Sequence, residues 1–253
     1  MPFAIYPSLK ERVIFVTGGG SGIGESIVEH FCVQQSKVAF VDINADASNA
    51  LVDRLATAGN APRFIECDIR DIAALQAAVA TTVSELGTIE CLVNNAADDE
   101  RHEVADVTVE YWDDRFAINL RPHFFTAQAA FPGMKAAGGG SIINVGSISW
   151  KESFNSVVCY QAAKCAVHGL TRALATGMGP DRVRVNTVMP GWIMTQKQLD
   201  LWVDDDAEIL LEARQRLPDK LYPPDIARMV LFLAADDSEH CTAQEFTVDG
   251  GWT

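Results

Sequence analysis

The sequence lacks the marks of several protein classes. It contains no C-x-x-C pair among its six cysteines and no histidine cluster at metal-ligand spacing, so we expect reduced thiols and no bound metal. Near the N-terminus no apolar run is long enough for a signal peptide or a membrane span, which favours a cytoplasmic location. Basic residues are scarce: 20 against 34 acidic ones give a net charge of −14, which disfavours nucleic acid and anionic membranes as partners.

The sequence also lacks a linker. No Pro/Ser-rich or low-complexity segment divides it. With 253 residues, of which 48% are hydrophobic, the chain can bury a large core. We therefore predict a single domain that covers residues 1–253.

Short β-branched segments alternate with longer helical patterns along the chain. The strand-like segments are 12–17, 37–42, 63–68, 90–95, 141–147, 183–190 and 245–251. The helical patterns cover 24–35, 47–58, 72–86, about 111–137, the region around Tyr160 and the segment after 225. This order is typical of βαβ units and predicts an α/β fold: a doubly wound, seven-stranded parallel sheet with helices on both faces and ligands at the carboxyl ends of its strands.

A glycine-rich turn follows the first strand and leads directly into a helix. Its glycines are Gly18, Gly22 and Gly24, a spacing that differs from the G-x-G-x-x-G fingerprint. Glycines let the backbone approach a pyrophosphate, and the helix N-terminus offers N–H groups to it. We interpret the turn as a dinucleotide site, with a merely tight connection as the alternative.

The second strand-like segment ends in Asp42. A carboxylate at this place accepts hydrogen bonds from ribose hydroxyls and repels a 2′-phosphate, which favours NAD over NADP. The alternative is that Asp42 caps the next helix, although Asn44 or Asp46 can also serve as that cap.

A tyrosine and a lysine stand four residues apart in a small-residue helical segment. Tyr160 and Lys164 share one face of that helix, where an ammonium favours the phenolate and lowers a phenol pKa that starts near ~10. The pair then suits general base catalysis. The alternative is a tyrosine at the edge of the core and a lysine that extends to solvent.

Further motifs follow one another in a fixed order. They are Thr17-Gly18-x-x-x-Gly22-x-Gly24, Asp42, Asp68, the "NNAA" segment 94–97, Asn119, Ser147, Tyr160-x-x-x-Lys164, Pro190-Gly191 and a late "DGG". In this ordered set the chain resembles the short-chain dehydrogenase/reductase family over essentially its whole length. The family has a Rossmann fold, which agrees with the predicted sheet. Ala97 departs from the family, which usually has glycine there.

The resemblance implies a complete set of NAD contacts. The pyrophosphate would be held by Gly18, Ser21, Gly22, Ile23 and Gly24. The adenosine would contact Asp42, Asp68 and Ile69, and the nicotinamide half would contact Asn95, Ala96, Tyr160, Lys164, Pro190, Ile193 and Thr195.

The resemblance also implies catalytic roles. Tyr160 would accept the proton of the substrate alcohol, and Lys164 would stabilise the phenolate and bind the ribose. Ser147 would orient the substrate oxygen. Asn119 would interrupt its helix and hold a water that links Lys164 to solvent. Taken alone, Ser147 also suits a strand-end turn, and Asn119 an exposed helix face.

The segments "DDERHEVADVT", "GSISW" and "CTAQEFTVDGGW" resemble bacterial NAD-dependent aldose 1-dehydrogenases of the L-arabinose, D-xylose or L-fucose type. This resemblance implies that Asp99, Ser149 and Trp192 contact the sugar together with Ser147 and Tyr160, that the segment up to Trp202 forms a lid, and that the enzyme is a homotetramer. One alternative treats the acidic segment as a solvated rim around an apolar cleft for a 3-oxoacyl or steroid substrate. Another is a nucleotide-sensing scaffold without catalysis.

Overall fold

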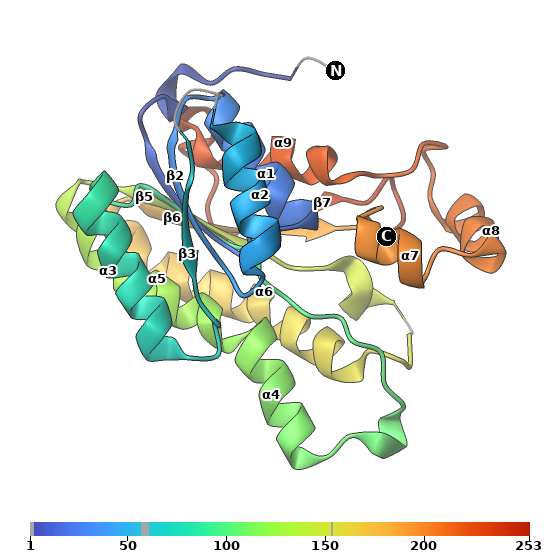
Figure 1. Cartoon of the computed structure of the whole chain (residues 1–253). Coiled ribbons are helices and arrows are strands. Elements are labelled where there is room, and N and C mark those ends of the chain that lie inside the picture. The colour runs from blue at the N-terminus through green and yellow to red at the C-terminus, as the bar shows by residue number, and fades with distance from the viewer. Residues whose placement is uncertain (1–2, 57–60, 153) are drawn as a thin grey trace.

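The computed structural model describes residues 3–56, 61–152 and 154–253. Seven strands form one parallel sheet, as predicted from the sequence, and the structure shows their order to be β3-β2-β1-β4-β5-β6-β7 (Figure 1). The strands are β1 (Val13–Thr17), β2 (Lys37–Asp42), β3 (Arg63–Glu66), β4 (Cys91–Asn94), β5 (Gly140–Val145), β6 (Val183–Pro190) and β7 (Glu245–Val248).

The order of the sheet reverses at β1, which pairs with β2 on one side and with β4 on the other. Every residue of β1 and of β4 is buried, because helices cover both faces of the sheet. Thr17 and Asn94, the last residues of the two strands, are register partners. Chain segments leave this point in opposite directions, which opens a crevice for ligands at the carboxyl edge.

Helices form a layer on each face of the sheet (Figure 1). On one face α1 (Gly22–Val33) packs against α9 (Pro223–Ala234), with α2 (Ala45–Leu55) beside α1. The other face carries α3 (Ile72–Leu86), α4 (Val109–Asn119), α5 (Arg121–Ala136) and α6 (Val158–Met178). One buried apolar cluster fills each interface between sheet and helices. No helix of the described ranges is both long and apolar enough to cross a membrane.

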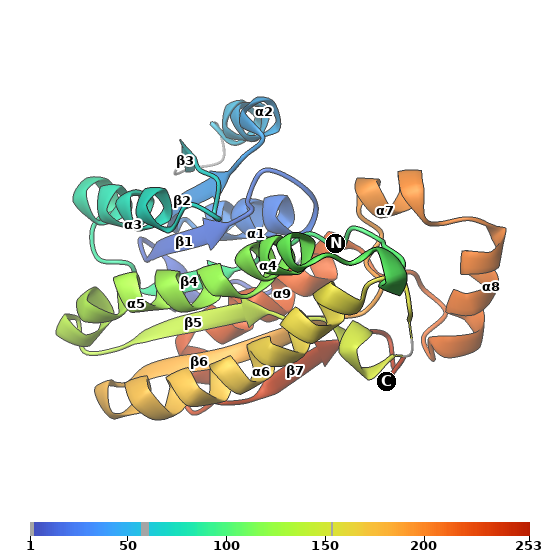
Figure 2. The same ribbon diagram turned by 90° about the horizontal axis from the view of Figure 1, so that it is seen from below.

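Two helices that the sequence analysis did not predict lie beyond the carboxyl edge of the sheet (Figure 2). They are α7 (Gln196–Leu201) and α8 (Asp205–Arg214). Each begins with a side-chain cap, since Thr195 accepts from the N–H of Gln198 and Asp204 from that of Ala207. Short 3₁₀ helices complete the described chain: η1 (Pro7–Leu9), η2 (Val104–Asp106), η3 (Ile148–Lys151), η4 (Gly179–Asp181) and η5 (Asp236–Ser238).

The single helix predicted over about 111–137 is wrong. The segment forms α4 and α5, which are separated at Leu120 with φ −135° and ψ −52°. Pro122 has no N–H to continue the ladder of α4, so a new helix starts there. Asn119, the residue expected to interrupt the helix, is the last residue of α4. The helix predicted over 47–58 is α2, and residues 57 and 58 lie outside the described chain.

Candidate active site

A cleft of about 350 Å³ opens at the carboxyl ends of β4, β5 and β6. Eleven of the predicted site residues line it: Ile23, Asn95, Asp99, Ser147, Ser149, Tyr160, Lys164, Pro190, Trp192, Ile193 and Thr195. The other predicted residues lie outside its walls, namely Gly18, Ser21, Gly22, Gly24, Asp42, Asp68, Ile69, Ala96 and Asn119. The cleft therefore contains all the residues assigned to the substrate and, apart from Ala96, all those assigned to the nicotinamide half, whereas none of those assigned to the adenosine line it.

Tyr160 and Lys164 come from the first two turns of α6. The Nζ atom of Lys164 lies 5.6 Å from the centroid of the Tyr160 ring and donates a hydrogen bond to the backbone oxygen of Val145 at 2.7 Å. The Lys164 residue is 1% exposed. The alternative in which this lysine extends to solvent is therefore wrong: Lys164 is buried beside the cleft and Tyr160 is partly buried there.

Burial dominates the proton equilibria of this pair. It lowers the pKa of Lys164 to about 7, against the opposite effect of the Asp99 carboxylate. It raises the pKa of Tyr160 above the ordinary value, and Asp99 and Asp98 add to that rise while the hydrogen bond with Ser147 opposes it. The lowered tyrosine pKa expected from the sequence is thus wrong for the protein alone. Lys164 loses part of its charge at neutral pH, and nearby carboxylates disfavour a phenolate.

Ser147 follows β5 and begins η3. Its Oγ atom accepts the N–H of Ser149 at 3.1 Å, and its hydroxyl also hydrogen-bonds Tyr160. The serine therefore closes a turn and reaches the tyrosine as well. The hydroxyl of Ser149, in contrast, is buried and has no hydrogen-bond partner among the described residues. Ser149 lines the cleft, and a buried hydroxyl without a partner gains a hydrogen bond from any polar group that comes close to it.

Asn119 is completely buried at the end of α4. Its Oδ1 atom accepts the N–H of Asp98 at 2.9 Å, and its Nδ2 atom donates to the backbone oxygens of Asp98 and Arg115, both at 3.0 Å. The alternative of an exposed polar residue is therefore wrong. The side chain holds the loop after β4, and its suggested water link to Lys164 stays a prediction.

The glycine-rich turn is packed too closely for other side chains. A Cβ atom on Gly18, where φ is +67°, would lie 2.7 Å from the Cα of Ala96, and one on Gly24 would lie 1.8 Å from the oxygen of Gly18. Ser21 is the N-cap of α1 and makes no side-chain cap hydrogen bond. The first turn of α1 thus offers its N–H groups to a ligand, which fits a dinucleotide pyrophosphate.

Ala97 lines the cleft at the position where the family usually has glycine. It is not among the non-glycine residues with positive φ, so its backbone conformation does not require glycine. The departure from the family pattern therefore adds a methyl group to the cleft wall without backbone strain.

Asp42 connects β2 with the glycine-rich turn. Its Oδ2 atom accepts the N–H of Gly20 and its Oδ1 atom accepts the N–H of Asn44, both at 2.9 Å. The cap of α2 is Asn44, whose side chain accepts from Ala47 at 3.1 Å. Each carboxylate oxygen of Asp42 keeps a further acceptor site for a hydroxyl. Asn44 therefore caps α2, and Asp42, the residue assigned to the ribose, does not.

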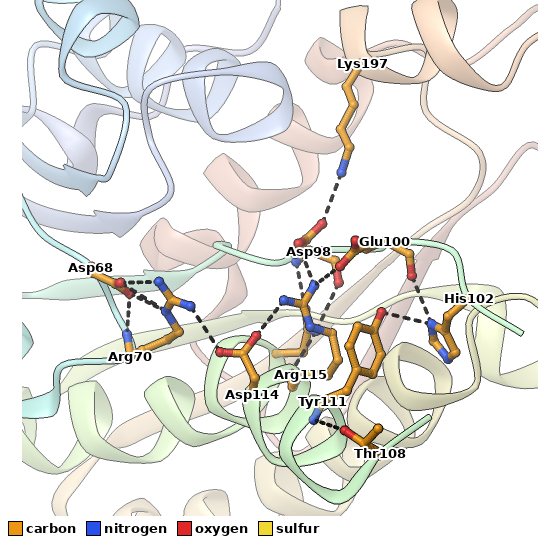
Figure 3. Close-up of polar contacts among 11 residues, drawn as sticks. Asp68, Arg70, Asp98, Glu100, His102, Thr108, Tyr111, Asp114, Arg115 and Lys197 are labelled. Atoms are coloured by element: carbon orange, nitrogen blue, oxygen red, sulfur yellow. Dashed lines mark hydrogen bonds and ion pairs between the residues drawn. The ribbon is translucent and has the colours of Figure 1, made fainter. Parts of the chain in front are cut away.

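Asp68, which the resemblance assigns to the adenosine, is bound to Arg70 (Figure 3). The Nη2 atom of Arg70 lies 2.6 Å from Oδ2 of Asp68, and this hydrogen-bonded pair holds the pKa of Asp68 below its ordinary range. Arg70 also contacts Asp114 at 3.1 Å. The neighbouring Ile69 is 8% exposed. Asp68 thus lies at the start of a network of charged side chains.

Arg115 of α4 is the centre of that network (Figure 3). Its side chain is 10% exposed and lies 2.7 Å from Asp98, 3.0 Å from Glu100 and 2.5 Å from Asp114. Ion pairs link Asp68, Arg70, Asp114, Arg115, Asp98 and Lys197 in turn, from the adenosine side to α7. The sequence analysis missed Arg115, because a single arginine directly after two aspartates on a helix resembles an exposed charged face.

The acidic segment after "NNAA" contacts α7. Asp99 accepts from Lys197 Nζ and from Gln198 Nε2, each at 2.7 Å, and Gln198 Oε1 accepts from Trp192 Nε1 at 2.9 Å. Burial by itself would raise the pKa of Asp99, but the hydrogen bonds and charge of Lys197, with help from Gln198, outweigh it and hold this pKa below its ordinary value. Asp99 is therefore paired with α7, while its side chain stays 34% exposed.

The described residues contain no group of three or more His, Cys, Asp or Glu side chains placed to hold a metal ion.

Arg101 stacks over Trp202, with its Cζ atom 3.7 Å from the ring centroid. Like Arg115, the α7 residues Lys197 and Gln198 were missed by the sequence analysis. The N-cap Thr195 was the only local signal of the helix that presents them.

Comparisons with known proteins identify the family. A family model described as enoyl-(acyl carrier protein) reductase matches residues 18–253. The solved structure of a short-chain type dehydrogenase/reductase from Mycobacterium ulcerans superposes with a TM-score of 0.92 at 28% identity, over 97% of this chain and 90% of that one. The chain belongs to the short-chain dehydrogenase/reductase family. As a member it is an oxidoreductase that acts on CH–OH groups with a nicotinamide cofactor.

Two curated relatives resemble this dehydrogenase over their full length. D-xylose 1-dehydrogenase of Caulobacter vibrioides is 44% identical over 252 residues, with 100% of both chains covered. A probable galactose dehydrogenase of Rhizobium meliloti is 43% identical over 252 residues, which cover 99% of this chain and 98% of that protein.

The buried position of Lys164 predicts a pH-dependent stability. Its pKa is about 7 in the folded protein against an ordinary 10.5. Between these values the unfolded chain binds one more proton than the folded chain, so the free energy of unfolding rises with pH by at most about 1.4 kcal/mol per pH unit. Burial of the charged lysine lowers the free energy of unfolding below pH 7, and this loss of stability decreases as the pH rises above that value.

Denaturant unfolding of the wild type and of Lys164→Met, followed from about pH 6 to about pH 9, measures this contribution. We expect the wild type to gain stability relative to the variant as the pH rises above 7. Lys10→Met, at an exposed lysine, serves as the control. The same pH dependence in the wild type and Lys164→Met would contradict the assignment.

Proposed function

We propose that this dehydrogenase is a single catalytic domain that oxidises the C1 hydroxyl of a cyclic aldose to an aldonolactone with NAD as the hydride acceptor. The observation that carries the substrate class is the 44% identity, over the full length of both chains, to a D-xylose 1-dehydrogenase. The second relative is a probable galactose dehydrogenase, so the proposal names the class of substrate and not one sugar.

The proposed cofactor contacts come from the glycine-rich turn, from the end of β2 and from the wall of the cleft. The turn from Gly18 to Gly24 and the N-terminus of α1 would hold the pyrophosphate. Asp42 would bind the ribose hydroxyls, and its negative charge supports NAD over NADP because it repels a 2′-phosphate. Asn95, Ile193 and Thr195 line the cleft where the nicotinamide half would lie.

The chemistry of the proposal is carried by three side chains in the cleft. A bound oxidised nicotinamide would supply the hydride acceptor and a positive charge that favours a phenolate. Tyr160, as the phenolate, accepts the proton of the C1 hydroxyl at its oxygen. Ser147 donates a hydrogen bond to the same substrate oxygen, and Lys164, held by Val145, stays beside the Tyr160 ring to stabilise its negative charge.

The cleft combines polar side chains with apolar walls, and this composition supports a sugar substrate. Ser149 offers an unpaired hydroxyl, and Asp99 and Gln198 add charged and amide groups. Trp192 and Trp252, which also line the cleft, provide apolar surface for a ring. A site built to bond hydroxyls rejects analogues that lack them by up to ~10⁴–10⁵-fold, since its own polar groups would stay unpaired.

In the same proposal the enzyme works in the cytoplasm as a homotetramer, as its resemblance to the family implies. Exposed apolar side chains on α4 and α5 support an assembly: Val109 is 72% exposed, and Trp112 and Phe124 are each 39% exposed.

The substrate class is tested by initial rates of NAD reduction with a panel of compounds. We expect turnover of D-xylose, L-arabinose, L-fucose or D-galactose, and poor rates with steroid alcohols and hydroxyacyl thioesters, which lack the hydroxyls that the cleft would bond. Aldoses that stay inert at tens of millimolar beside rapidly oxidised steroids or thioesters would overturn the sugar assignment.

Tyr160→Phe tests the proton acceptor. The variant keeps the ring beside Lys164 and removes only the hydroxyl, so NAD should still bind while kcat falls by about 10²–10⁴-fold. Steady-state kinetics and a fluorescence titration with NAD separate the two effects. More than about a tenth of the wild-type kcat in the variant would contradict the role.

Asp42→Ala and Asp42→Asn test the choice of cofactor. Both remove the charge, so the ratio of kcat/KM for NADP to that for NAD should rise in each. Asparagine keeps one acceptor for the N–H of Gly20 or Asn44, so it limits the structural damage. A wild type that already uses NADP as efficiently as NAD would show that Asp42 does not select the cofactor.

A further inference from the structure

Gln198 of α7 lies in the cleft between the side chains of Trp192 and Asp99. Its Oε1 atom lies 2.9 Å from Nε1 of Trp192, and its Nε2 atom lies 2.7 Å from Oδ2 of Asp99. All three residues line the cleft that contains Tyr160 and Ser147. Gln198 was not among the residues expected from the sequence or from the family resemblance.

The chemistry of the two neighbours fixes the orientation of the Gln198 amide. An indole N–H can only donate, so it must face the amide oxygen. A carboxylate can only accept, so it must face the amide nitrogen. Lys197 and Gln198 hold the pKa of Asp99 below its ordinary value, so Asp99 is ionised at neutral pH. A rotated amide would place two acceptors together on one side and two donors on the other.

This orientation leaves one hydrogen-bond donor unused. The amide nitrogen carries two N–H groups, and Asp99 accepts from one of them. The second N–H has no hydrogen-bond partner among the described residues. The buried hydroxyl of Ser149 lines the same cleft, again without a partner in the described chain. Partly buried polar groups of this kind gain most from a ligand that supplies hydroxyl oxygens.

We propose that Gln198 determines sugar specificity by donating its second N–H to a ring hydroxyl remote from C1, with Trp192 and Asp99 holding the amide in place. The proposal deepens the proposed function and rests on it. Asp99 then acts on the substrate through Gln198, as a positioning residue, and also anchors α7 through Lys197.

The test combines a residue change with a substrate change. Gln198→Met has a similar shape and no hydrogen-bonding group, and Gln196→Met on the same helix is the matched control, since the Gln196 amide is exposed and bonds Asp200 at 2.7 Å. The kcat/KM values of both variants and the wild type are measured with the best aldose and with its series of monodeoxy analogues, each lacking one hydroxyl other than that at C1.

We expect Gln198→Met to lower kcat/KM for the parent aldose by about tenfold or more, while Gln196→Met stays close to the wild type. With one particular deoxy sugar the wild type and Gln198→Met should differ by less than about twofold, because the partner hydroxyl is already missing. Such non-additivity at one hydroxyl identifies the group that Gln198 binds.

Two other results have distinct meanings. In the first, the wild type oxidises aldoses, but the kcat/KM of Gln198→Met falls by the same factor with every deoxy sugar or does not fall at all. Gln198 then does not bind a hydroxyl, so the inference is wrong while the proposed function stands. If the wild type oxidises no aldose and prefers steroid or thioester substrates, the proposed function fails and this inference fails with it.

Discussion

The side chain of Asn119 holds the backbone of Asp98 at both its N–H and its carbonyl, and the architecture of the substrate half depends on this contact. It fixes the loop that leaves β4 at the point where the sheet order reverses. With its backbone held, Asp98 turns its carboxylate to Arg115 and Lys197, and the next residue, Asp99, faces α7. The same amide also donates to the backbone oxygen of Arg115, and a buried amide that satisfies three backbone groups is rigid, because the loss of any of these bonds would leave an unpaired polar group.

Burial shifts the pKa values of Tyr160 and Lys164 in opposite directions. Burial favours the uncharged form of each group, so Lys164 loses charge and Tyr160 keeps its proton. The carboxylate of Asp99 opposes the effect on Lys164 and, together with that of Asp98, adds to the effect on Tyr160. Those carboxylates are themselves neutralised by Lys197 and Arg115. A positive charge added beside Tyr160 would therefore act in a place where few solvent molecules screen it, and its effect on the phenol would be large.

The sequence was sufficient to predict the seven strands and the residues that can be recognised from their near neighbours in the chain. Glycine spacing, the strand-end Asp42 and the Tyr160–Lys164 pair each carry a short-range signal, and the structure places them at one edge of the sheet. Contacts between distant segments could not be read in this way. Arg115 and Gln198 have unremarkable neighbours in the sequence, and their partners lie 17 and 99 residues away. The pKa of Tyr160 was also misjudged, because burial depends on the whole fold.

The two halves of the site are built from different parts of the chain, and this separation has a physical consequence. The adenosine side depends on β1, β2, β3 and their turns, where glycines without room for a Cβ leave little freedom to vary. The substrate side is formed where the loop after β4 meets α7, through the side chains of Asp99, Lys197 and Gln198. Side-chain contacts between two surface segments can change without disturbing the sheet. Substrate preference can therefore diverge within one fold while the cofactor half stays the same, which is why the substrate must be argued from residues such as Gln198 and not from the fold.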